Sequence, residues 1–184
     1  MALTKVLTGG LALDAVDNTI LKLDDDYALT GTVTGAGGIL QVVSTTKTDT
    51  FSTTSGSFTD VTGLTAAITP TSATSKVFII VNFSTSNSGT SSLNVFNLVR
   101  DSTNISQPAT TPTYNGSFGN YHAVADNIMP TSFTFLDSPE TTSATTYKLQ
   151  MRTNAGTVTI NRRNSTDAAF TSTFTLMEIA GWEI

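Results

Sequence analysis

One stretch near the middle of the chain is apolar at five consecutive positions and predicts a buried β-strand. Residues 77–81 read VFIIV, a run that is rich in β-branched side chains and too short for a buried helix. We take residues 76–84 as the central strand of a sheet. Both faces of such a strand need cover. A second sheet would cover one face, and either a neighbouring subunit or the chain's own loops would cover the other.

From Ile39 onward, apolar and polar residues alternate with the period of a β-strand, and helical spacing does not recur. We expect the chain to reverse in a hairpin at residues 154–156 and to run irregularly over residues 105–130. The alternation predicts an all-β fold, an antiparallel β-sandwich of the jelly-roll type that spans residues 39–184. The side chains predicted to face its core include Leu64, Ala66, Ile68, Phe133, Phe135, Tyr147, Leu149, Met151, Val158, Ile160, Phe174 and Leu176.

Residues 1–38 differ from the rest because their apolar residues are too sparse for a core of their own. Leu13, Val16, Ile20, Leu23 and Tyr27 follow one another in steps of three and four, as in a short coiled coil. Part of the same stretch also alternates as an extended strand would, and we favour that interpretation. In either form the segment can bury these side chains only against another chain. It is therefore predicted to be an attachment or stalk segment with a glycine-rich joint, the alternative being a partly disordered tail.

Composition limits the possible partners. Charged residues make up 12% of the chain, about half the usual share, and roughly three residues in ten are Ser or Thr. The surface is therefore expected to be neutral and rich in hydroxyl groups. A net charge of -5 leaves no basic patch for a nucleic acid. Neither membrane insertion nor export is indicated, because no apolar run reaches 18 residues and no signal-peptide core is recognisable.

Residues that could support catalysis or bind metal are scarce. The chain has no cysteine and a single histidine, His122, so thiolate sites and two-histidine sites are excluded within one chain. The run of aspartates at residues 24–26 lacks the alternating ligands of a calcium loop. Glycoside hydrolysis needs two facing carboxylates, but the acids are predicted to lie in loops or turns, or, for Glu178, in a strand without an identifiable partner. We predict no enzyme activity, no cofactor and no metal. The loop acids in question are Asp126, Asp137 and Glu140.

The irregular stretch 105–130 is the best candidate for ligand binding. Its aromatic and amide side chains are of the kinds that stack on sugar rings and bond to hydroxyl groups without carrying charge. We expect this stretch to form an exposed tip that contacts a cell-surface glycan. The alternative is that the same side chains fill space under a loop or at a subunit interface. The candidate glycan-binding residues are Tyr114, Asn115, Phe118, Asn120, Tyr121 and His122.

Four segments resemble the carboxy-terminal domains of bacteriophage tail fibres and related virion fibre proteins. The most extensive covers residues 60–76, which read DVTGLTAAITPTSATSK. The others are DSPETTSATTY at 137–147, TVTINR at 157–162 and STFTLMEI at 172–179. The first five residues, MALTK, also resemble the start of many fibre proteins of marine phages.

The resemblance implies a homotrimeric structural protein of the virion, made in the cytoplasm of the bacterial host. Residues 1–38 would then attach to other tail or virion proteins, and the sandwich would meet the host surface. Two alternatives remain. One is a capsid-mounted head fibre or decoration protein, and the other is a free carbohydrate-binding module.

Overall fold

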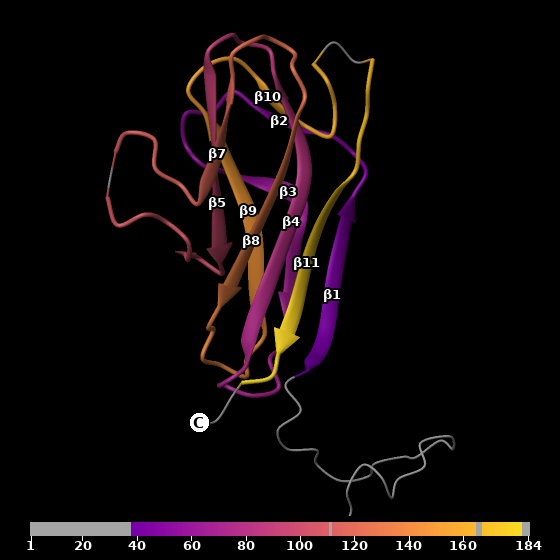
Figure 1. Cartoon of the computed structure of the whole chain (residues 1–184), viewed down its shortest axis with the longest axis vertical. Helices are drawn as coiled ribbons and strands as arrows, with labels where there is room; N and C mark the ends of the chain where they lie inside the picture. The colour runs from indigo at the N-terminus through magenta and orange to yellow at the C-terminus, as the bar shows by residue number, and fades with distance from the viewer. Residues whose placement is uncertain (1–37, 111, 165–166, 182–184) are drawn as a thin grey trace, which may run out of the picture. The chain divides into compact units, whose positions relative to one another are not determined.

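The computed structural model describes residues 38–110, 112–164 and 167–181, and within these ranges every regular element is a β-strand (Figure 1). Apart from Gly38, the predicted attachment segment 1–38 lies outside the described residues. Two antiparallel sheets face each other, so the predicted all-β sandwich is confirmed. The described part of the chain contains no helix with the length and apolar character that crossing a membrane requires.

The strand order is that of a jelly roll. The first sheet, called sheet A, has four long strands in the order β1, β11, β4 and β8, while the second, sheet B, runs β3, β9, β5 and β7. Along the chain the long strands alternate between the sheets, except that β5 and β7 are neighbours in sheet B. Sheet A comprises β1 (Ile39–Lys47), β2 (Phe51–Thr53), β4 (Lys76–Asn87), β8 (Met129–Asp137), β10 (Val158–Ile160) and β11 (Ser172–Ile179), and sheet B comprises β3 (Thr59–Ile68), β5 (Ser92–Arg100), β6 (Thr103–Asn104), β7 (Phe118–His122) and β9 (Thr145–Thr153).

The predicted central strand is confirmed as β4, which pairs with β11 and β10 along one edge and with β8 along the other. Val77, Ile79 and Val81 are buried between the sheets, whereas Phe78 and Ile80 lie on the outer face and are half-buried. The predicted end at residue 84 is three residues too early. The strand continues through buried polar side chains to Asn87, because these side chains find hydrogen-bond partners, Asn87 between the sheets and Ser86 in the connection after β10.

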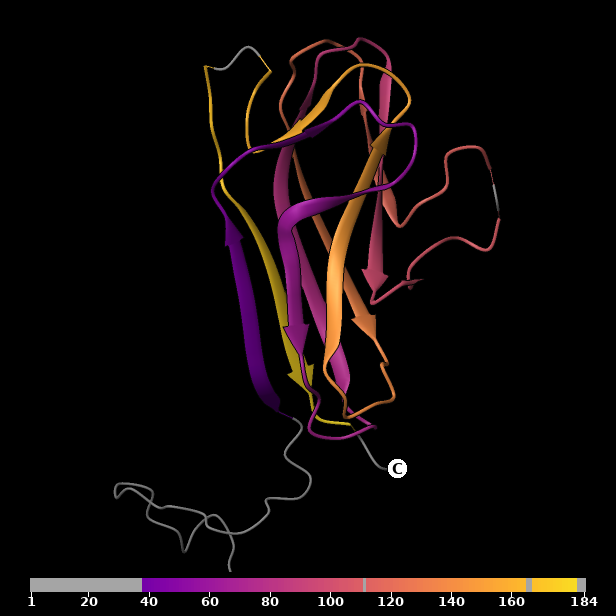
Figure 2. The same cartoon turned by 180° about the vertical axis from the view of Figure 1, so that it is seen from behind.

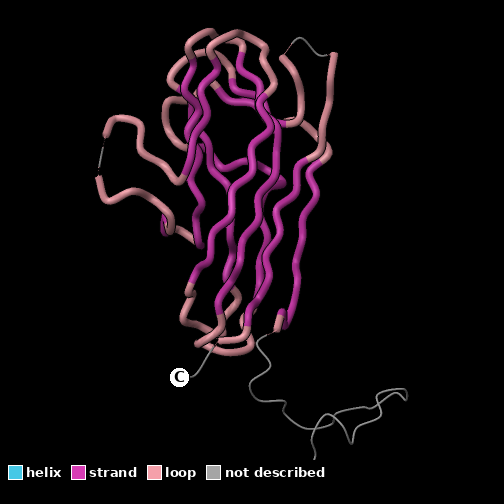
Figure 3. Tube along the Cα trace, viewed as in Figure 1, coloured by secondary structure: helices cyan, strands magenta, loops and turns pink. Residues whose placement is uncertain are grey.

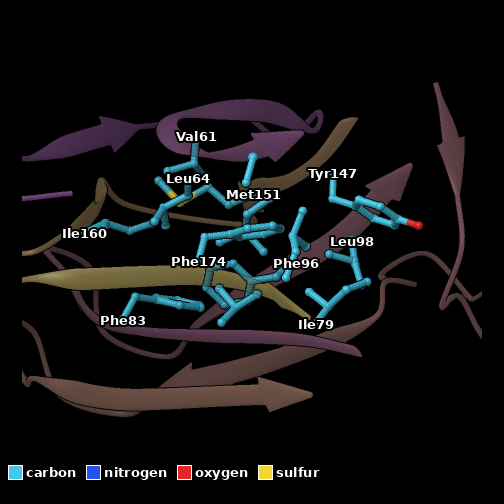
Figure 4. Packing of buried hydrophobic residues seen from close by; sticks show 14 of the residues in the cluster. Val61, Leu64, Ile79, Phe83, Phe96, Leu98, Tyr147, Met151, Ile160 and Phe174 are labelled. Atoms are coloured by element: carbon cyan, nitrogen blue, oxygen red, sulfur yellow. The ribbon is translucent and has the colours of Figure 1, made fainter. Parts of the chain in front are cut away.

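The core lies between the sheets and consists of side chains from both (Figure 4). Tyr147, Leu149 and Met151 of β9 face Ile79 and Phe174 of sheet A, as period-two alternation predicts. Each of these five side chains is fully buried. At one end of the core the Tyr147 ring turns its hydroxyl group away from the cluster (Figure 4).

The prediction of a hairpin at residues 154–156 is wrong. The chain does turn there, but β10 joins β2 and β4 in sheet A instead of returning beside β9. Both edges of β9 are already occupied by β3 and β5, so β10 has no place next to it in sheet B. Gly156 makes this crossing possible, since its φ is +69° and a Cβ atom at this position would clash with Asn87 and Gly89.

The irregular stretch predicted over 105–130 contains the strand β7 and the start of β8. What remains irregular is a loop over 105–117, which projects sideways from sheet B, and a shorter connection over 123–128 (Figures 2 and 3). The loop over 105–117 is fastened to β5 by hydrogen bonds from Ile105 N to Leu98 O (3.2 Å), from Ser117 N to Phe96 O (2.7 Å) and from Gln107 Nε2 to Asn97 Oδ1 (2.9 Å).

Candidate functional site

Strand β7 divides the six candidate residues between the interior and the surface. Its alternation turns Phe118, Asn120 and His122 toward the other sheet, and Gly119 and Tyr121 outward. The prediction of one exposed cluster of six is therefore corrected. The spacing of Phe118, Asn120 and His122 at every second position was a signal for a strand that the surrounding Pro and Gly residues obscured.

Phe118 belongs to an aromatic stack inside the sandwich. Its ring centroid lies 4.3 Å from that of Phe133 and 5.1 Å from that of Phe96, with nearly parallel planes. Phe96 in turn meets the Phe83 ring edge to face at 4.9 Å. Offset and edge-to-face aromatic pairs of this kind stabilise a core beyond the area they bury. The ring therefore acts in packing, which is the alternative role considered for these residues.

Asn120 is engaged in hydrogen bonds that cross between the sheets. Its amide nitrogen donates to Thr85 Oγ1 (2.8 Å) and to Thr131 Oγ1 (3.1 Å), and its carbonyl oxygen accepts from Asn94 Nδ2 (3.0 Å). Asn94 also accepts from Asn87 Nδ2 (2.8 Å). A buried network in which each polar group has a partner fixes one arrangement of the two sheets. Asn120 is thus part of the scaffold.

His122 is completely buried next to this network. Its Nε2 atom lies 3.3 Å from Thr85 Oγ1. Burial lowers the pKa of His122 below its ordinary value, and the nearby backbone of Asn127 opposes this effect only in part. The ring is therefore neutral at pH 7. Within the described residues no three acidic, histidine or cysteine side chains gather in a way that could hold a metal ion.

Tyr114, Asn115 and Tyr121 are the candidates that reach the surface. Tyr114 is 44% exposed and Tyr121 is 53% exposed, and Asn115 is half-buried. Tyr121 stands on the outer face of β7, opposite Leu93 of β5. These residues mark the outer side of sheet B as the surface on which a ligand could meet exposed aromatic rings.

Arg152 of β9 holds Tyr114 against this outer face. The guanidinium carbon lies 5.2 Å from the Tyr114 ring centroid and 4.9 Å from that of Phe58, so the cation is placed between two aromatic rings. Nη2 of Arg152 also donates to Thr113 O (2.5 Å). An arginine in this position had no signal in the sequence, since the three segments that it joins are far apart along the chain.

The register of sheet B brings Tyr121 near this cluster. Val95 of β5 pairs with Arg152 on one side and with Gly119 on the other, and Tyr121 lies two residues beyond Gly119 on the same face. Gly119 carries no side chain, so β7 presents none beside Val95 at the level of Arg152. We call Phe58, Tyr114, Tyr121 and Arg152 the aromatic surface. Rings held on a rigid sheet suit the stacking of a flat, uncharged ligand.

Two carboxylate side chains, for which the sequence predicted no partner, are buried on sheet A in the same row of paired residues. Asp137 of β8 and Glu178 of β11 both flank Val77 of β4. Oδ2 of Asp137 accepts from the Tyr147 hydroxyl group (2.7 Å) and from Arg100 Nη1 (2.8 Å). These two hydrogen bonds join sheet A to sheet B, so the Asp137 carboxylate has a structural role.

Glu178 is engaged in the same way. Oε1 accepts from both the backbone N and the Oγ1 of Thr71 (2.7 Å each), and Oε2 accepts from Gln41 Nε2 (2.6 Å). Burial alone would raise the pKa of Glu178, but the hydrogen bonds from Gln41 and Thr71 outweigh it and lower the pKa. The carboxylate is thus ionised and ties the connection between β3 and β4 to β11. A general acid in glycoside hydrolysis needs the opposite shift.

A groove of about 550 Å³ lies at the end of the sandwich opposite to Gly38. It runs between the connection 123–128 and the one that follows β10. Arg163 crosses it, donating from Nε to Asp126 O (3.0 Å) and forming an ion pair with Asp167 (2.8 Å). The sequence did not indicate this groove, because its two sides come from separate connections. It is lined by Val124, Ala125, Asp126, Asn127, Ile128, Arg163, Asp167 and Ala168.

Comparison with known proteins gives little further information. No protein-family model matches the chain, and no curated protein sequence matches it. Among solved structures, a chain of the infectious bursal disease virus Gt strain matches with a TM-score of 0.41 and 12% identity, and a chain of the Gx strain matches with a TM-score of 0.36 and 16% identity. Each match covers 77% of this chain and 38% of the viral one. Similarity at this level does not identify a function.

Proposed function

We propose that this protein is a structural protein of a bacteriophage virion, a trimeric tail fibre that attaches the particle to the host cell. The resemblance of residues 60–76 and 172–179 to virion fibre domains supports the class of protein. In the sandwich these residues form β3, the turn into β4, and β11. Jelly rolls recur in viral and sugar-binding proteins, which agrees with the proposal as an analogy of fold alone.

The single observation that carries the attachment role is the aromatic surface. Tyr114 and Tyr121 are exposed on one face, and Arg152 and the pairing of β5 with β7 hold them in place. Rings stack on the apolar faces of sugars, and the many nearby hydroxyl and amide groups can bond to sugar hydroxyls. A host cell-surface glycan is therefore the proposed ligand, with Tyr114, Asn115 and Tyr121 as contacts.

The rest of the chain has a structural task in this proposal. Residues 1–38 would attach the fibre to other virion proteins, and no catalytic step is assigned to the sandwich. Its two inward-facing carboxylates, Asp137 and Glu178, already bind Tyr147, Arg100, Thr71 and Gln41. The protein would be made in the cytoplasm of the bacterial host and would function in the virion.

A test of attachment compares virions that carry the wild-type chain with virions that carry Tyr114→Ala and Tyr121→Ala together. We expect the double variant to adsorb to host cells at least tenfold more slowly while the oligomer remains intact. Val124→Ala is the control, because Val124 is 64% exposed and belongs to the connection 123–128, which contributes no residue to the aromatic surface. Unchanged adsorption of the double variant would contradict the glycan-binding role.

A second measurement addresses the place of the protein on the particle. Antibody labelling of intact virions in the electron microscope is expected to mark the tail. Labelling of the capsid would favour a head fibre or decoration protein. A chain that is absent from purified virions would favour a free carbohydrate-binding module, since a jelly roll serves that role equally well.

A further inference from the structure

The outer face of sheet A, formed by β1, β11, β4 and β8, carries almost no charge. Four long strands contribute to it, and their outward side chains alternate with those that face the core. Lys76, at one end, is the only charged residue among them, and it donates a hydrogen bond to Ser138 Oγ. The outward residues are Leu40, Val42, Ser44, Thr46, Lys76, Phe78, Ile80, Asn82, Ser84, Pro130, Ser132, Thr134, Leu136, Thr173, Thr175, Met177 and Ile179.

An apolar row crosses this face from edge to edge. Leu136 of β8 pairs with Phe78 of β4, Phe78 pairs with Met177 of β11, and Met177 pairs with Val42 of β1. Leu136 and Val42 are each 54% exposed. Ile80, Ile179 and Leu40 extend the row into a contiguous patch. Contiguous exposed apolar surface of this kind marks an interaction site.

The opposite sheet shows how the chain covers a strand that is apolar on both faces. Val95 of β5 is buried even though it points outward, because Gly116 of the loop over 105–117 lies directly against its side chain. Over the apolar row of sheet A, the described residues place no such loop, and β8, β4, β11 and β1 lie side by side in view (Figure 1). The outer face of β4 therefore depends on something other than the described part of this chain for its cover.

The chemistry of the face indicates which partner fits it. With its one lysine at the margin, the face offers no pattern of charge for an oppositely charged protein to match. Beyond the apolar row it presents Ser, Thr and Asn side chains, which both donate and accept hydrogen bonds and can therefore pair with a copy of themselves. Each copy carries a net charge of -5, so copies can approach most closely through a surface that is free of acidic groups.

The size of the face is also sufficient. Four strands spaced about 4.8 Å apart and nine residues long span about 19 by 30 Å. Side chains raise the accessible area above this flat projection, toward the roughly 800 Å² per partner of a standard interface. A hollow of about 310 Å³ between β4 and β8 offers space for side chains of a partner.

We propose that the outer face of sheet A is the surface through which copies of this chain contact one another, with Phe78 and Met177 at its centre. Burial in the assembly then covers the second face of the central strand. This surface supplies the interface that a trimeric fibre requires. This inference rests on the proposed function only for the number of copies in the assembly, which is three.

The test measures the molar mass of the full chain by light scattering, for the wild type and two variants. In the first variant, Val42→Asp and Leu136→Asp place a charge at both ends of the apolar row. Each of these side chains is half-exposed, so the core is left untouched. The second variant, Val124→Asp, adds the same charge at an exposed apolar residue that belongs to the connection 123–128 and not to sheet A. Circular dichroism checks that all three chains are folded.

We expect the wild type and Val124→Asp to form the same oligomer, and the double variant to have the mass of one chain, 19.3 kDa. If aspartate disrupts the strands, Val42→Thr with Leu136→Thr replaces it, since threonine suits a strand. We expect this milder pair to raise the dissociation constant at least tenfold.

Two results would overturn the proposal. One is a double-aspartate variant that keeps the oligomer of the wild type, or a threonine pair whose dissociation constant equals that of the wild type. The other is a wild-type chain that is monomeric. In that case residues 1–38 or a different protein would have to cover the outer face of sheet A. A wild-type dimer that dissociates in the double variant would support the surface and contradict the trimeric fibre. Adsorption of the variant with Tyr114→Ala and Tyr121→Ala is measured separately. The proposals of glycan binding and of self-association through sheet A can therefore fail independently.

Discussion

The hydroxyl group of Tyr147 donates a hydrogen bond to Asp137 Oδ2 over 2.7 Å and so joins the two sheets inside the sandwich. Arg100 donates to the same oxygen, which places the carboxylate between a phenol and a guanidinium group. Burial and the adjacent Asp137 carboxylate raise the pKa of Tyr147 far above its ordinary value, so the phenol keeps its proton. The phenol therefore remains a donor to Asp137 at alkaline pH.

Replacing Tyr147 with phenylalanine should destabilise the sandwich by about 1 to 3 kcal/mol, because a buried carboxylate loses one of its two donors. Chemical denaturation followed by circular dichroism measures the change. Tyr114→Phe is the control, since it removes the hydroxyl of an exposed tyrosine and should change stability by less than about 0.5 kcal/mol. Equal stability of the two variants would show that the bond to Asp137 contributes nothing.

His122 should make the fold sensitive to mild acid. Since burial lowers its folded-state pKa below 6.5, the unfolded chain binds a proton more readily than the folded one, and the free energy of unfolding falls as the pH drops below about 6.5. The lowered pKa values of Asp60 and Glu178 act only at lower pH, below their ordinary values of 3.8 and 4.5.

Denaturation curves between about pH 5 and pH 7 test this prediction. The wild type should lose stability across the window, whereas His122→Gln should be less stable at pH 7 but nearly independent of pH. Parallel pH profiles for the two proteins would contradict a role for His122 in acid sensitivity.

Two glycines offer a matched pair for testing backbone geometry. Gly156 has a φ of +69° and no space for a Cβ atom, so Gly156→Ala should cost about 2 kcal/mol or more. At Gly56 the nearest atom to an added Cβ, Thr153 O, is 3.9 Å away, and Gly56→Ala should change stability by less than about 0.5 kcal/mol. Thermal unfolding of both variants checks the difference, and a tolerated Gly156→Ala would argue against the crossing between sheets at this residue.

Phe174 and Phe78 should differ in their contribution to stability. Phe174 is fully buried between the sheets, so Phe174→Ala should cost about 3 to 5 kcal/mol. Phe78 lies half-buried on the outer face, so Phe78→Ala should cost only about 1 to 2 kcal/mol within a single subunit.

This comparison is made in the Val42→Asp and Leu136→Asp background, where contact between subunits cannot contribute. In the wild-type background Phe78→Ala should instead weaken the oligomer. An equal loss of stability for the two phenylalanines in the double-aspartate background would contradict the position of Phe78 on the outer face.

Much of the fold follows from local pattern. Alternation along β9 identified Tyr147, Leu149 and Met151 as core residues, because in a strand each second side chain faces the same side. The apolar run of 77–81 identified the central strand for a different reason, since five consecutive apolar residues rich in β-branched side chains favour a strand. Only a strand with cover on both faces is apolar at every position.

The candidate site was less predictable. Tyr114 and Tyr121 do lie exposed on one surface, but Phe118, Asn120 and His122 point into the sandwich. Pro and Gly residues on both sides concealed the strand β7, which turns some of these residues inward and Tyr121 outward. Arg152, which holds Tyr114, belongs to a strand nearly forty residues further along the chain.

The sequence alone thus determined the class of fold, the core face of most strands and the neutral, hydroxyl-rich character of the surface. Each of these depends on composition or on the spacing of near neighbours in the chain. The tertiary structure decided which strands pair, that the turn at 154–156 crosses between sheets, and that Asp137 and Glu178 have buried partners. It also aligned Leu136, Phe78, Met177 and Val42 into one row. Such relations depend on strand register between segments remote in sequence, and register emerges only when the two sheets pack together.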